Sequence, residues 1–342
     1  MAGTILVSGA PVVIAGSLVE QALAAGYRVV GTVRNPDDTA RTGFLRAMAG
    51  DLALVAADLT AADPFTDHAE VDAILHIASP YALVVRDAQR DLVDPAVKGT
   101  LSMLRAARAH PRVKRVVLTS SFAAVTDEPG KAVLTEADWN TKSTLRRNPY
   151  YLSKTLAERA AWEFMAREKP GFDLVVINPF AVIGPSHSRA INTSVSLFPA
   201  LLKGAYPAVM AMTWGFVDVR DVAAAHLAAL DRPGAAGRYL CVAQNLSMAG
   251  IIAVMQAEGY PGKLPKRDLS GPFGTALLKL ASYSQPRGIG SYLRSHLGRV
   301  PRYDAGKSVR ELGMHYRPAI ESVKDTLADL VRWGHVAPPQ HR

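Results

Sequence analysis

Short apolar runs and helical segments alternate through the first half of this sequence, and this alternation restricts the fold more than any other feature. Apolar runs without a polar face are typical of strands that are covered on both sides. Strands that alternate with helices predict an α/β fold with a doubly wound parallel sheet. The expected strands are residues 5–8, 28–33, 53–56, 73–77, 113–119 and 174–178, and the expected helices are residues 16–25, 95–109 and 151–168.

Residues 4–38, "TILVSGAPVVIAGSLVEQALAAGYRVVGTVRNPDD", have the order of a strand, a turn, an amphipathic helix and a second strand. This order opens the Rossmann fold, in which glycines let the turn approach a pyrophosphate at the start of the helix. Only Gly9 stands where a glycine is expected, and Pro11, Val12 and Val13 follow it. Proline removes a backbone N–H, and valine disfavours a positive φ and adds a branched side chain. We therefore expect that this turn, the phosphate cradle of the fold, still binds the pyrophosphate of a dinucleotide, but more weakly than the usual glycine-rich turn does.

The pattern loosens after residue 178 into loops marked by Pro and Gly and into shorter helices. The stretches "GFVDVRDVAAAHLAAL" and "GRYLCVA" then indicate a helix and a strand that return to the sheet. We expect a dinucleotide-binding Rossmann domain from residues 1–178 and 216–245. Residues 179–215 and 246–342 are expected to form a smaller substrate-binding lobe over the carboxyl edge of the sheet.

The composition is ordinary for a globular protein, with 49% hydrophobic and 20% charged residues among 342. No apolar run approaches the roughly 20 residues that cross a bilayer, and no basic stretch precedes the first apolar segment. We therefore expect a cytoplasmic protein without a membrane segment. A single cysteine, Cys241, excludes an internal disulfide and is expected to be buried and inert. None of the nine histidines has metal-ligand spacing with a partner, so no metal site is predicted.

The formal net charge is +9, and the positive residues are unevenly placed. Residues 263–317 contain eleven Lys and Arg against three acids. No basic run is interleaved with stacking aromatic residues, so a nucleic-acid partner is not expected. A solvated basic face that helps to attract a phosphorylated cofactor is the favoured interpretation.

Tyr150 and Lys154 stand four residues apart near the start of an expected helix, which places both side chains on one face. A nearby ammonium favours the phenolate of a tyrosine and lowers its pKa, so the pair can give a proton to a developing alkoxide. The spacing alone is weak, because any amphipathic helix can produce it. Ser120 and Ser121 strengthen the hypothesis, since they follow a buried strand at the carboxyl edge, where a carbonyl group would bind.

Several further motifs follow one another in a fixed order along nearly the whole chain. They are "GYRVVGTVRNP", "ADLT", "ILHIASPY", "DPAVKGTL", "VVLTSSFAAV", "YYLSKTLAERAAW", "INPFAVIGP", "FVDVRDVAAAH" and "SVRELGMHYRPAIESVKD". In this order they resemble the extended short-chain dehydrogenases/reductases, in the branch of dihydroflavonol reductase and cinnamoyl-CoA reductase that also holds microbial aldehyde and ketone reductases. The resemblance implies an NADPH-dependent reductase of a small-molecule carbonyl substrate, a monomer or a homodimer. Ser121 would hydrogen-bond the carbonyl, Tyr150 would donate the proton, and Lys154 would bind the nicotinamide ribose. Ser121 is chosen over Ser120 because it matches the catalytic position of the family.

The end of the second expected strand indicates which nucleotide is bound. NAD enzymes usually place Asp or Glu about 20 residues after the glycine turn, whereas this chain has Arg34, with Arg41 seven residues later. A planar guanidinium suits a 2'-phosphate, and the NADPH enzymes of the family have a similar pattern, so NADPH is expected. The alternative is that both arginines are merely solvated. The resemblance implies further cofactor contacts from Gly9, Val12, Val13, Ile14, Asp58, Leu59, Ala78, Ser79, Tyr150, Lys154 and Pro179.

Substrate contacts are indicated only by resemblance. Tyr81, Phe122 and Phe180 lie beside the reacting centre in the family, although all three could be core residues. Trp214, Met210 and Met212 form an apolar group that could line a pocket, and core packing is an equal alternative.

Two other classes of function remain open beside the carbonyl reductase. One is a binding or regulatory protein that keeps the Rossmann fold but has lost turnover, and the other is a nucleotide-sugar epimerase on the same fold. The presence of Ser121, Tyr150 and Lys154 together favours the reductase over the binding protein. The middle of the chain is more similar to the reductase branch than to the epimerases.

Overall fold

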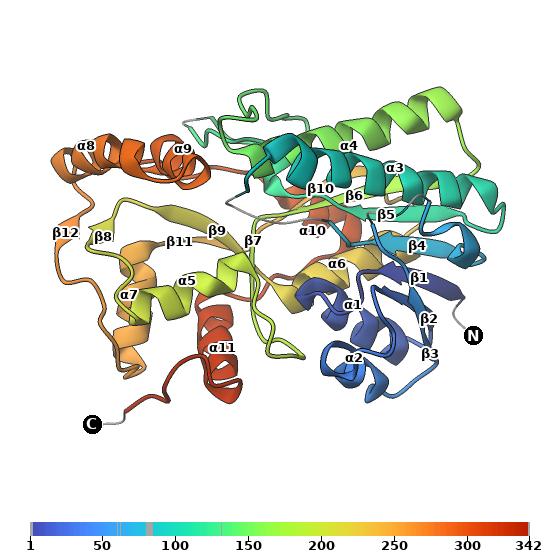
Figure 1. Cartoon of the computed structure of the whole chain (residues 1–342), viewed down its shortest axis with the longest axis horizontal. Coiled ribbons are helices and arrows are strands. Elements are labelled where there is room, and N and C mark those ends of the chain that lie inside the picture. Colours follow the sequence, from blue (N-terminus) through green and yellow to red (C-terminus); the bar gives the residue numbers. More distant parts are fainter. Residues whose placement is uncertain (1–2, 60, 62, 80–84, 131, 341–342) are drawn as a thin grey trace.

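The computed structural model describes residues 3–59, 61, 63–79, 85–130 and 132–340. Within these residues, seven parallel strands form the main sheet, in the order β10-β6-β5-β4-β1-β2-β3 (Figure 1). The chain extends this sheet from β1 in two directions, so the topological switch point lies between β1 and β4. The strands are β1 (Thr4–Ser8), β2 (Arg28–Val33), β3 (Leu52–Ala56), β4 (Ala73–His76), β5 (Arg115–Thr119), β6 (Asp173–Pro179) and β10 (Gly237–Cys241).

Helices cover both faces of the main sheet, which explains why its strands are continuous apolar runs. Side chains alternate between the two faces, so Ile5 and Val7 enter one core while Leu6 enters the other. The first core lies under α1 (Val13–Ala24) and α6 (Val219–Asp231), and the second under α3 (Asp94–Ala109) and α4 (Pro149–Glu168). Full burial of each such side chain contributes about 1.5 to 3 kcal/mol. Two shorter helices, α2 (Thr39–Arg46) and α10 (Gly306–Leu312), flank the sheet.

The predicted doubly wound α/β fold is confirmed. The observed bounds of β2 equal those predicted, and the other five predicted strands differ from the observed ones by at most two residues at either end. The strand expected to return is β10, which pairs with β6 at the edge of the sheet. The helix after the odd turn begins at Val13, three residues earlier than expected. The start of the stretch expected to be a returning helix, up to Asp218, instead belongs to a strand of a second sheet.

This second sheet has three strands in the described chain, in the order β11-β9-β7. Figure 1 shows it on the left, among helices that lie away from β1, β2 and β3. Its strands are β7 (Ala181–Ile183), β9 (Thr213–Asp218) and β11 (Gln244–Ser247), and a small pair is formed by β8 (Val209–Met210) and β12 (Asp268–Leu269). The helices of this part are α5 (Thr193–Leu202), α7 (Met248–Ala257), α8 (Pro272–Ala281), α9 (Arg287–His296) and α11 (Ala319–Arg332), and the short helical turns of the chain are η1 (Thr66–His68), η2 (Gln89–Val93), η3 (Phe122–Ala124) and η4 (Ser282–Ser284).

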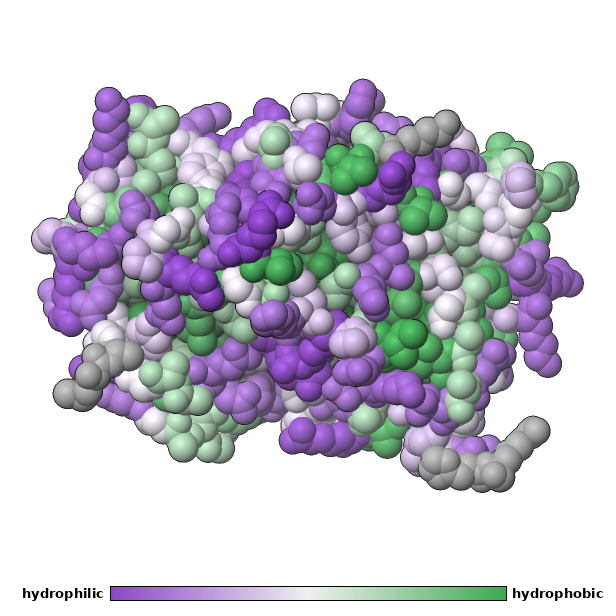
Figure 2. Space-filling model, turned by 180° about the vertical axis from the view of Figure 1, so that it is seen from behind, coloured by the Kyte–Doolittle hydropathy of each residue, from purple (hydrophilic) through white to green (hydrophobic). Residues whose placement is uncertain are grey.

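A separate hydrophobic core fills this second part. Met210 and Met212 are buried in it, and Trp214 packs against it and donates a hydrogen bond from Nε1 to the Tyr292 hydroxyl at 2.8 Å. Figure 2 shows hydrophilic and hydrophobic residues interspersed over the face opposite to Figure 1. In the part of the chain that the structure describes, no helix is both long enough and apolar enough to span a membrane.

Candidate active site

Tyr150 and Lys154 lie in the first two turns of α4, as predicted. Pro149 occupies the first helical position, where its missing N–H is not needed. Asn148 precedes it with a φ of 47°, a left-handed conformation that asparagine tolerates better than most residues. Its side chain does not cap α4 but reaches α9, donating from Nδ2 to Ser295 Oγ at 3.0 Å and accepting at Oδ1 from Ser291 Oγ at 2.8 Å. Thus α9 fixes the start of α4, a role for Asn148 that sequence reasoning missed.

Lys154 is buried, with 8% of its surface exposed, whereas Tyr150 is half-buried. Burial lowers the pKa of the Lys154 ammonium to about 8, and the negative charge of Glu158, one turn further along α4, opposes that shift. The ammonium is therefore retained at neutral pH although the side chain is buried. Such a group favours the phenolate of a neighbouring tyrosine.

The two adjacent serines at the end of β5 differ in what their hydroxyls bind. Ser120 is buried, and its Oγ donates to Glu158 Oε2 at 2.5 Å. Ser121 is half-buried, and its Oγ accepts from the N–H of Ala123 at 3.2 Å in η3, which packs against α4. Among the described residues, the Ser121 hydroxyl donates to no acceptor. Its proton is available to a substrate oxygen, which supports the choice of Ser121.

Gly9 forms the turn between β1 and α1 beside Ala78. Its φ is +70°, and a Cβ placed on it would lie 3.0 Å from the Ala78 Cβ. Its N–H donates to Thr32 Oγ1 at 3.1 Å. The turn therefore contacts β2 on one side and the residues after β4 on the other. This is the switch point, where open α/β sheets bind their ligands.

The valines of the odd turn adopt ordinary conformations. Val12 has φ −75° and ψ 147° and directly precedes α1, and Val13 is the first helical residue. Only Gly9 in this turn has a positive φ, so the expected backbone conflict of valine is absent. Two of the expected causes of weaker binding remain: Pro11 has no N–H, and the Val12 side chain, which is 48% exposed, lies at the helix start. The helix has no side-chain cap, so its first N–H groups can face an anion.

A buried network that sequence reasoning missed lies directly below this turn. Ser8 Oγ accepts the N–H groups of Ile77 at 2.9 Å and Ala78 at 3.0 Å, and therefore donates to His76 Nδ1 at 2.8 Å. His76 is consequently neutral, and burial, aided by the charge of Lys154, lowers its pKa to about 3. Ser79, the next predicted cofactor contact, is half-buried at the end of this segment.

The residues predicted to bind the adenosine half of the cofactor gather around the ends of β2 and β3. Arg34 directly follows β2 and is exposed, and it forms no hydrogen bond or ion pair with other described residues. Arg41, also exposed, lies on α2 with Nε 3.6 Å from Asp38 Oδ2. Asp58 is exposed after β3, and Leu59 packs against α3 at Gly99, where the lack of a side chain leaves room for it.

The predicted nicotinamide and substrate residues lie at the ends of β5 and β6. Pro179 is the last residue of β6 and is paired with Cys241, which is buried as expected. The Phe122 and Phe180 rings stack with their centroids 4.0 Å apart. Phe122 is buried among Val125, Leu240 and Val242, so most of its surface serves packing, whereas Phe180 is half-buried. Tyr81 lies outside the described residues.

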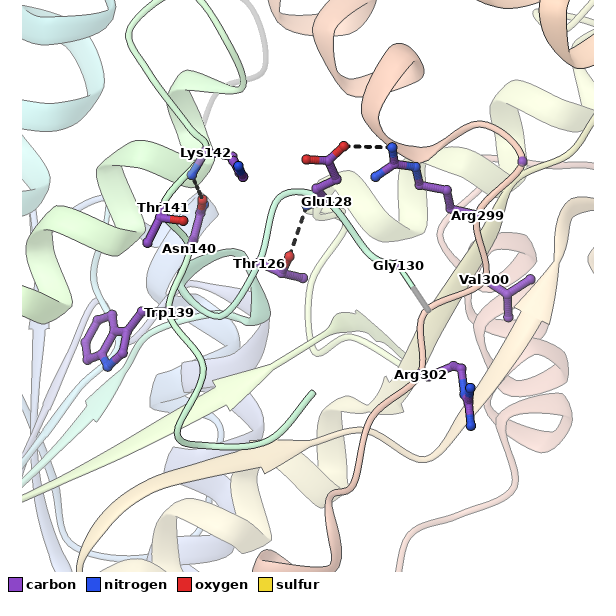
Figure 3. Close-up of a pocket in the computed structure, with 11 residues that line it drawn as sticks. Thr126, Glu128, Gly130, Trp139, Asn140, Thr141, Lys142, Arg299, Val300 and Arg302 are labelled. Carbon is purple, nitrogen blue, oxygen red and sulfur yellow. Dashed lines mark hydrogen bonds and ion pairs between the residues drawn. The ribbon is translucent and has the colours of Figure 1, made fainter. Parts of the chain in front are cut away.

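A cavity of about 730 Å³ lies between the loop after η3 and the segment after α9 (Figure 3). Asn140 ties its wall to η3 by donating from Nδ2 to the Ala123 carbonyl at 2.8 Å. Arg299 donates to Glu128 at 2.7 Å across one end of it. Its described lining also includes Thr126, Gly130, Trp139, Thr141, Lys142, Gly298, Val300 and Arg302, so three cations face one acid.

No group of three or more His, Cys, Asp or Glu residues suited to a metal ion occurs in the described parts of the chain.

Residues 5–242 match the NAD dependent epimerase/dehydratase family. Cinnamoyl-CoA reductase 1 of Arabidopsis thaliana is 35% identical over 344 residues, covering 98% of this chain and 91% of the relative. Tetraketide alpha-pyrone reductase 1 of the same plant is 32% identical over 350 residues, covering 98% and 97%. The crystal structure of a yeast methylglyoxal/isovaleraldehyde reductase complexed with NADPH superposes with a TM-score of 0.80 at 27% identity, covering 97% of this chain and 100% of that one. The chain therefore belongs to the NAD dependent epimerase/dehydratase family, among the extended short-chain dehydrogenases/reductases that include the cinnamoyl-CoA reductases.

Proposed function

We propose that this protein reduces an aldehyde or ketone to an alcohol with NADPH. The observation that carries the proposal is the start of α4, which holds Tyr150 and a buried Lys154 one turn apart and packs against η3. Ser121 directly precedes η3, and its hydroxyl donates to no acceptor in the described residues. The named relatives support it, since they are reductases and one of them was solved with NADPH.

The residues at the switch point fit a dinucleotide. The tight turn at Gly9, with φ +70° and a Cβ position only 3.0 Å from Ala78, and the uncapped start of α1 suit a pyrophosphate. The exposed guanidinium of Arg34, with Arg41 on the next helix, suits a 2'-phosphate, and an acidic residue at position 34 would repel it. When bound, NADPH supplies the hydride that the carbonyl carbon receives.

The side chains of this site then handle the carbonyl oxygen. Ser121 donates a hydrogen bond that orients it and stabilises the negative charge that develops there. Tyr150 gives its hydroxyl proton to that oxygen, completing the alcohol. The Lys154 ammonium favours the resulting phenolate and would also hold the ribose of the bound nucleotide. Carbon gains a hydride and oxygen gains a proton, so the reduction is balanced by oxidation of the nicotinamide.

The remainder of the substrate extends from this point along η3. Phe180 borders it, and the cavity that begins at Thr126 receives its far end. Lys142, Arg299 and Arg302 line this end together with a single acid, Glu128, to which Arg299 donates at 2.7 Å, and this lining favours a substrate with an acidic group there. A location in the cytoplasm and a monomeric or dimeric state remain predictions.

The test is NADPH oxidation, followed by its absorbance, with a panel of aldehydes, ketones and one sugar nucleotide. Each carbonyl acid in the panel is paired with its neutral ester. We expect turnover of carbonyl compounds, faster for the acids, and none of the sugar nucleotide. NADPH binding without turnover of any compound would favour the binding protein, and conversion of the sugar nucleotide would favour the epimerase.

A further inference from the structure

A buried carboxylate lies one turn beyond Lys154 on α4. Glu158 is 1% exposed and accepts hydrogen bonds from three other elements. Ser120 Oγ at the end of β5 donates at 2.5 Å, Asn178 Nδ2 on β6 at 2.8 Å, and Arg238 Nε on β10 at 2.5 Å. The Trp162 indole, on α4 itself, completes the set at 3.4 Å. Glu158 thus joins the helix of Tyr150 and Lys154 to three adjacent strands of the sheet.

The same network reaches the backbone of Ser121. Asn178 Nδ2, which donates to Glu158, also donates to the Ser121 carbonyl at 3.2 Å. Displacement of the carboxylate would therefore move Asn178 and, with it, the residue expected to hold the substrate carbonyl.

Arg238 neutralises Glu158 from the other side. Its guanidinium is 7% exposed, donates to the carbonyls of Glu136 at 2.8 Å and Asp138 at 2.6 Å, and lies over the Trp139 ring at 3.9 Å. A buried ion pair of this kind is weak evidence for stability, because desolvation offsets most of the attraction. Its place beside Lys154 and Ser121 suggests a different purpose.

We propose that Glu158 and Arg238 are a positioning pair for the catalytic residues: the Glu158 carboxylate holds Ser121 in place through Asn178 and keeps Lys154 in its ammonium form, while Arg238 limits how strongly it does so. This rests on the proposed function of Ser121, Tyr150 and Lys154. The pair acts through those residues and touches neither substrate nor cofactor.

The charges around Lys154 permit a clear test of this proposal. Glu158 on α4 raises the pKa of Lys154, against the larger effect of burial. His76 on β4 faces Lys154 but is neutral, with a pKa of about 3, and Tyr150 lies one turn earlier on α4. Glu158 is therefore the charged neighbour that favours the ammonium, and Arg238 on β10 pairs with that carboxylate at 2.5 Å.

The experiment compares Glu158→Gln, Arg238→Met and Trp162→Phe with the original protein. Loss of the negative charge should lower the midpoint of Lys154 titration by about one pH unit or more, and loss of the guanidinium should raise it. Trp162→Phe removes an uncharged donor from the same carboxylate and should leave the midpoint unchanged. Damage to the fold alone would move the first two variants in the same direction.

The midpoint is measured without cofactor, from the side-chain NMR signals of carbon-13-labelled lysine, with Lys154 assigned by Lys154→Arg. The alkaline limb of kcat against pH should then move in the same directions as the midpoints. Equal or absent shifts in Glu158→Gln and Arg238→Met overturn the proposal.

If Glu158→Gln does not fold, Glu158→Asp replaces it. This variant keeps the charge, so the midpoint of Lys154 titration should stay, while kcat should fall at least tenfold because the shorter side chain releases Asn178. An Asp variant with unchanged kcat also overturns the proposal. Failure of the proposed function would appear separately, as absence of turnover with normal lysine titration.

Discussion

At the scale of single residues, the two serines after β5 show how neighbours decide a role. The Ser120 hydroxyl donates to a buried carboxylate, whereas that of Ser121 accepts a backbone N–H and, within the described parts of the chain, donates to no acceptor. Both serines look alike in the sequence. The difference comes from Glu158, which is far along the chain and close only in the folded protein.

Tyr150→Phe should reduce kcat by about 100- to 10,000-fold, because it removes the proton donor and keeps the ring. The NADPH dissociation constant should change little. Both are measured on one preparation, by steady-state rates and by titration of nucleotide fluorescence. A variant that retains more than about a tenth of the original kcat would place the proton donor elsewhere.

Arg34→Asp should weaken NADPH binding at least about tenfold while NADH binding is unchanged or improved. The carboxylate repels a 2'-phosphate and can accept a hydrogen bond from a free 2'-hydroxyl. Calorimetric titration with both cofactors measures the difference, and Arg28→Asp, an exposed arginine at the other end of β2, is the control for net charge. Equal losses for the two cofactors would mean that Arg34 faces solvent in the complex.

At the scale of helices and strands, the sequence best predicted the elements that depend on a local pattern of apolar and polar residues. Apolar runs located the strands, because both faces of this sheet are covered. The predicted helix begins at Gly16, three residues after the observed start of α1. Only the folded positions of Ala78 and Thr32 show that Gly9 is the residue of this turn with a positive φ. The hold of α9 on Asn148 and the Glu158–Arg238 pair join residues about 80 to 150 positions apart, which no local pattern reveals.

Restoring the turn with Pro11→Ser, Val12→Gly and Val13→Phe should lower the NADPH dissociation constant, by about tenfold or more. The change returns the N–H that proline lacks and clears the helix start of a branched side chain. Pro11→Ser alone separates the two contributions, and calorimetry measures both variants. If neither binds NADPH more tightly than the original, the uncapped start of α1 already provides the full cradle.

At the scale of the whole molecule, three buried histidines make the free energy of unfolding depend on pH. His76 joins β1 to β4, His226 on α6 accepts from Thr119 on β5 at 2.7 Å, and His296 ends α9. Burial lowers their pKa values to about 3, about 4 and about 4 from the ordinary 6.5. They therefore stay neutral in the folded protein at pH values where the unfolded chain takes up protons.

The free energy of unfolding should fall as pH drops from 6.5 to 5, since in that range the unfolded state binds more protons than the folded state. Each histidine contributes up to about 1.4 kcal/mol per pH unit, so the three together contribute up to about 4. Carboxylates that are paired in the fold, such as Asp72 beside Arg112, lose their stabilising effect only at lower pH. Urea unfolding at half-unit steps of pH measures the slope.

His226→Gln can keep both hydrogen bonds, to the Val222 carbonyl and from the Thr119 hydroxyl, without titrating, so it should remove about a third of that slope. A flat profile in the original protein between pH 6.5 and 5 would show that these histidines are not held neutral by the fold.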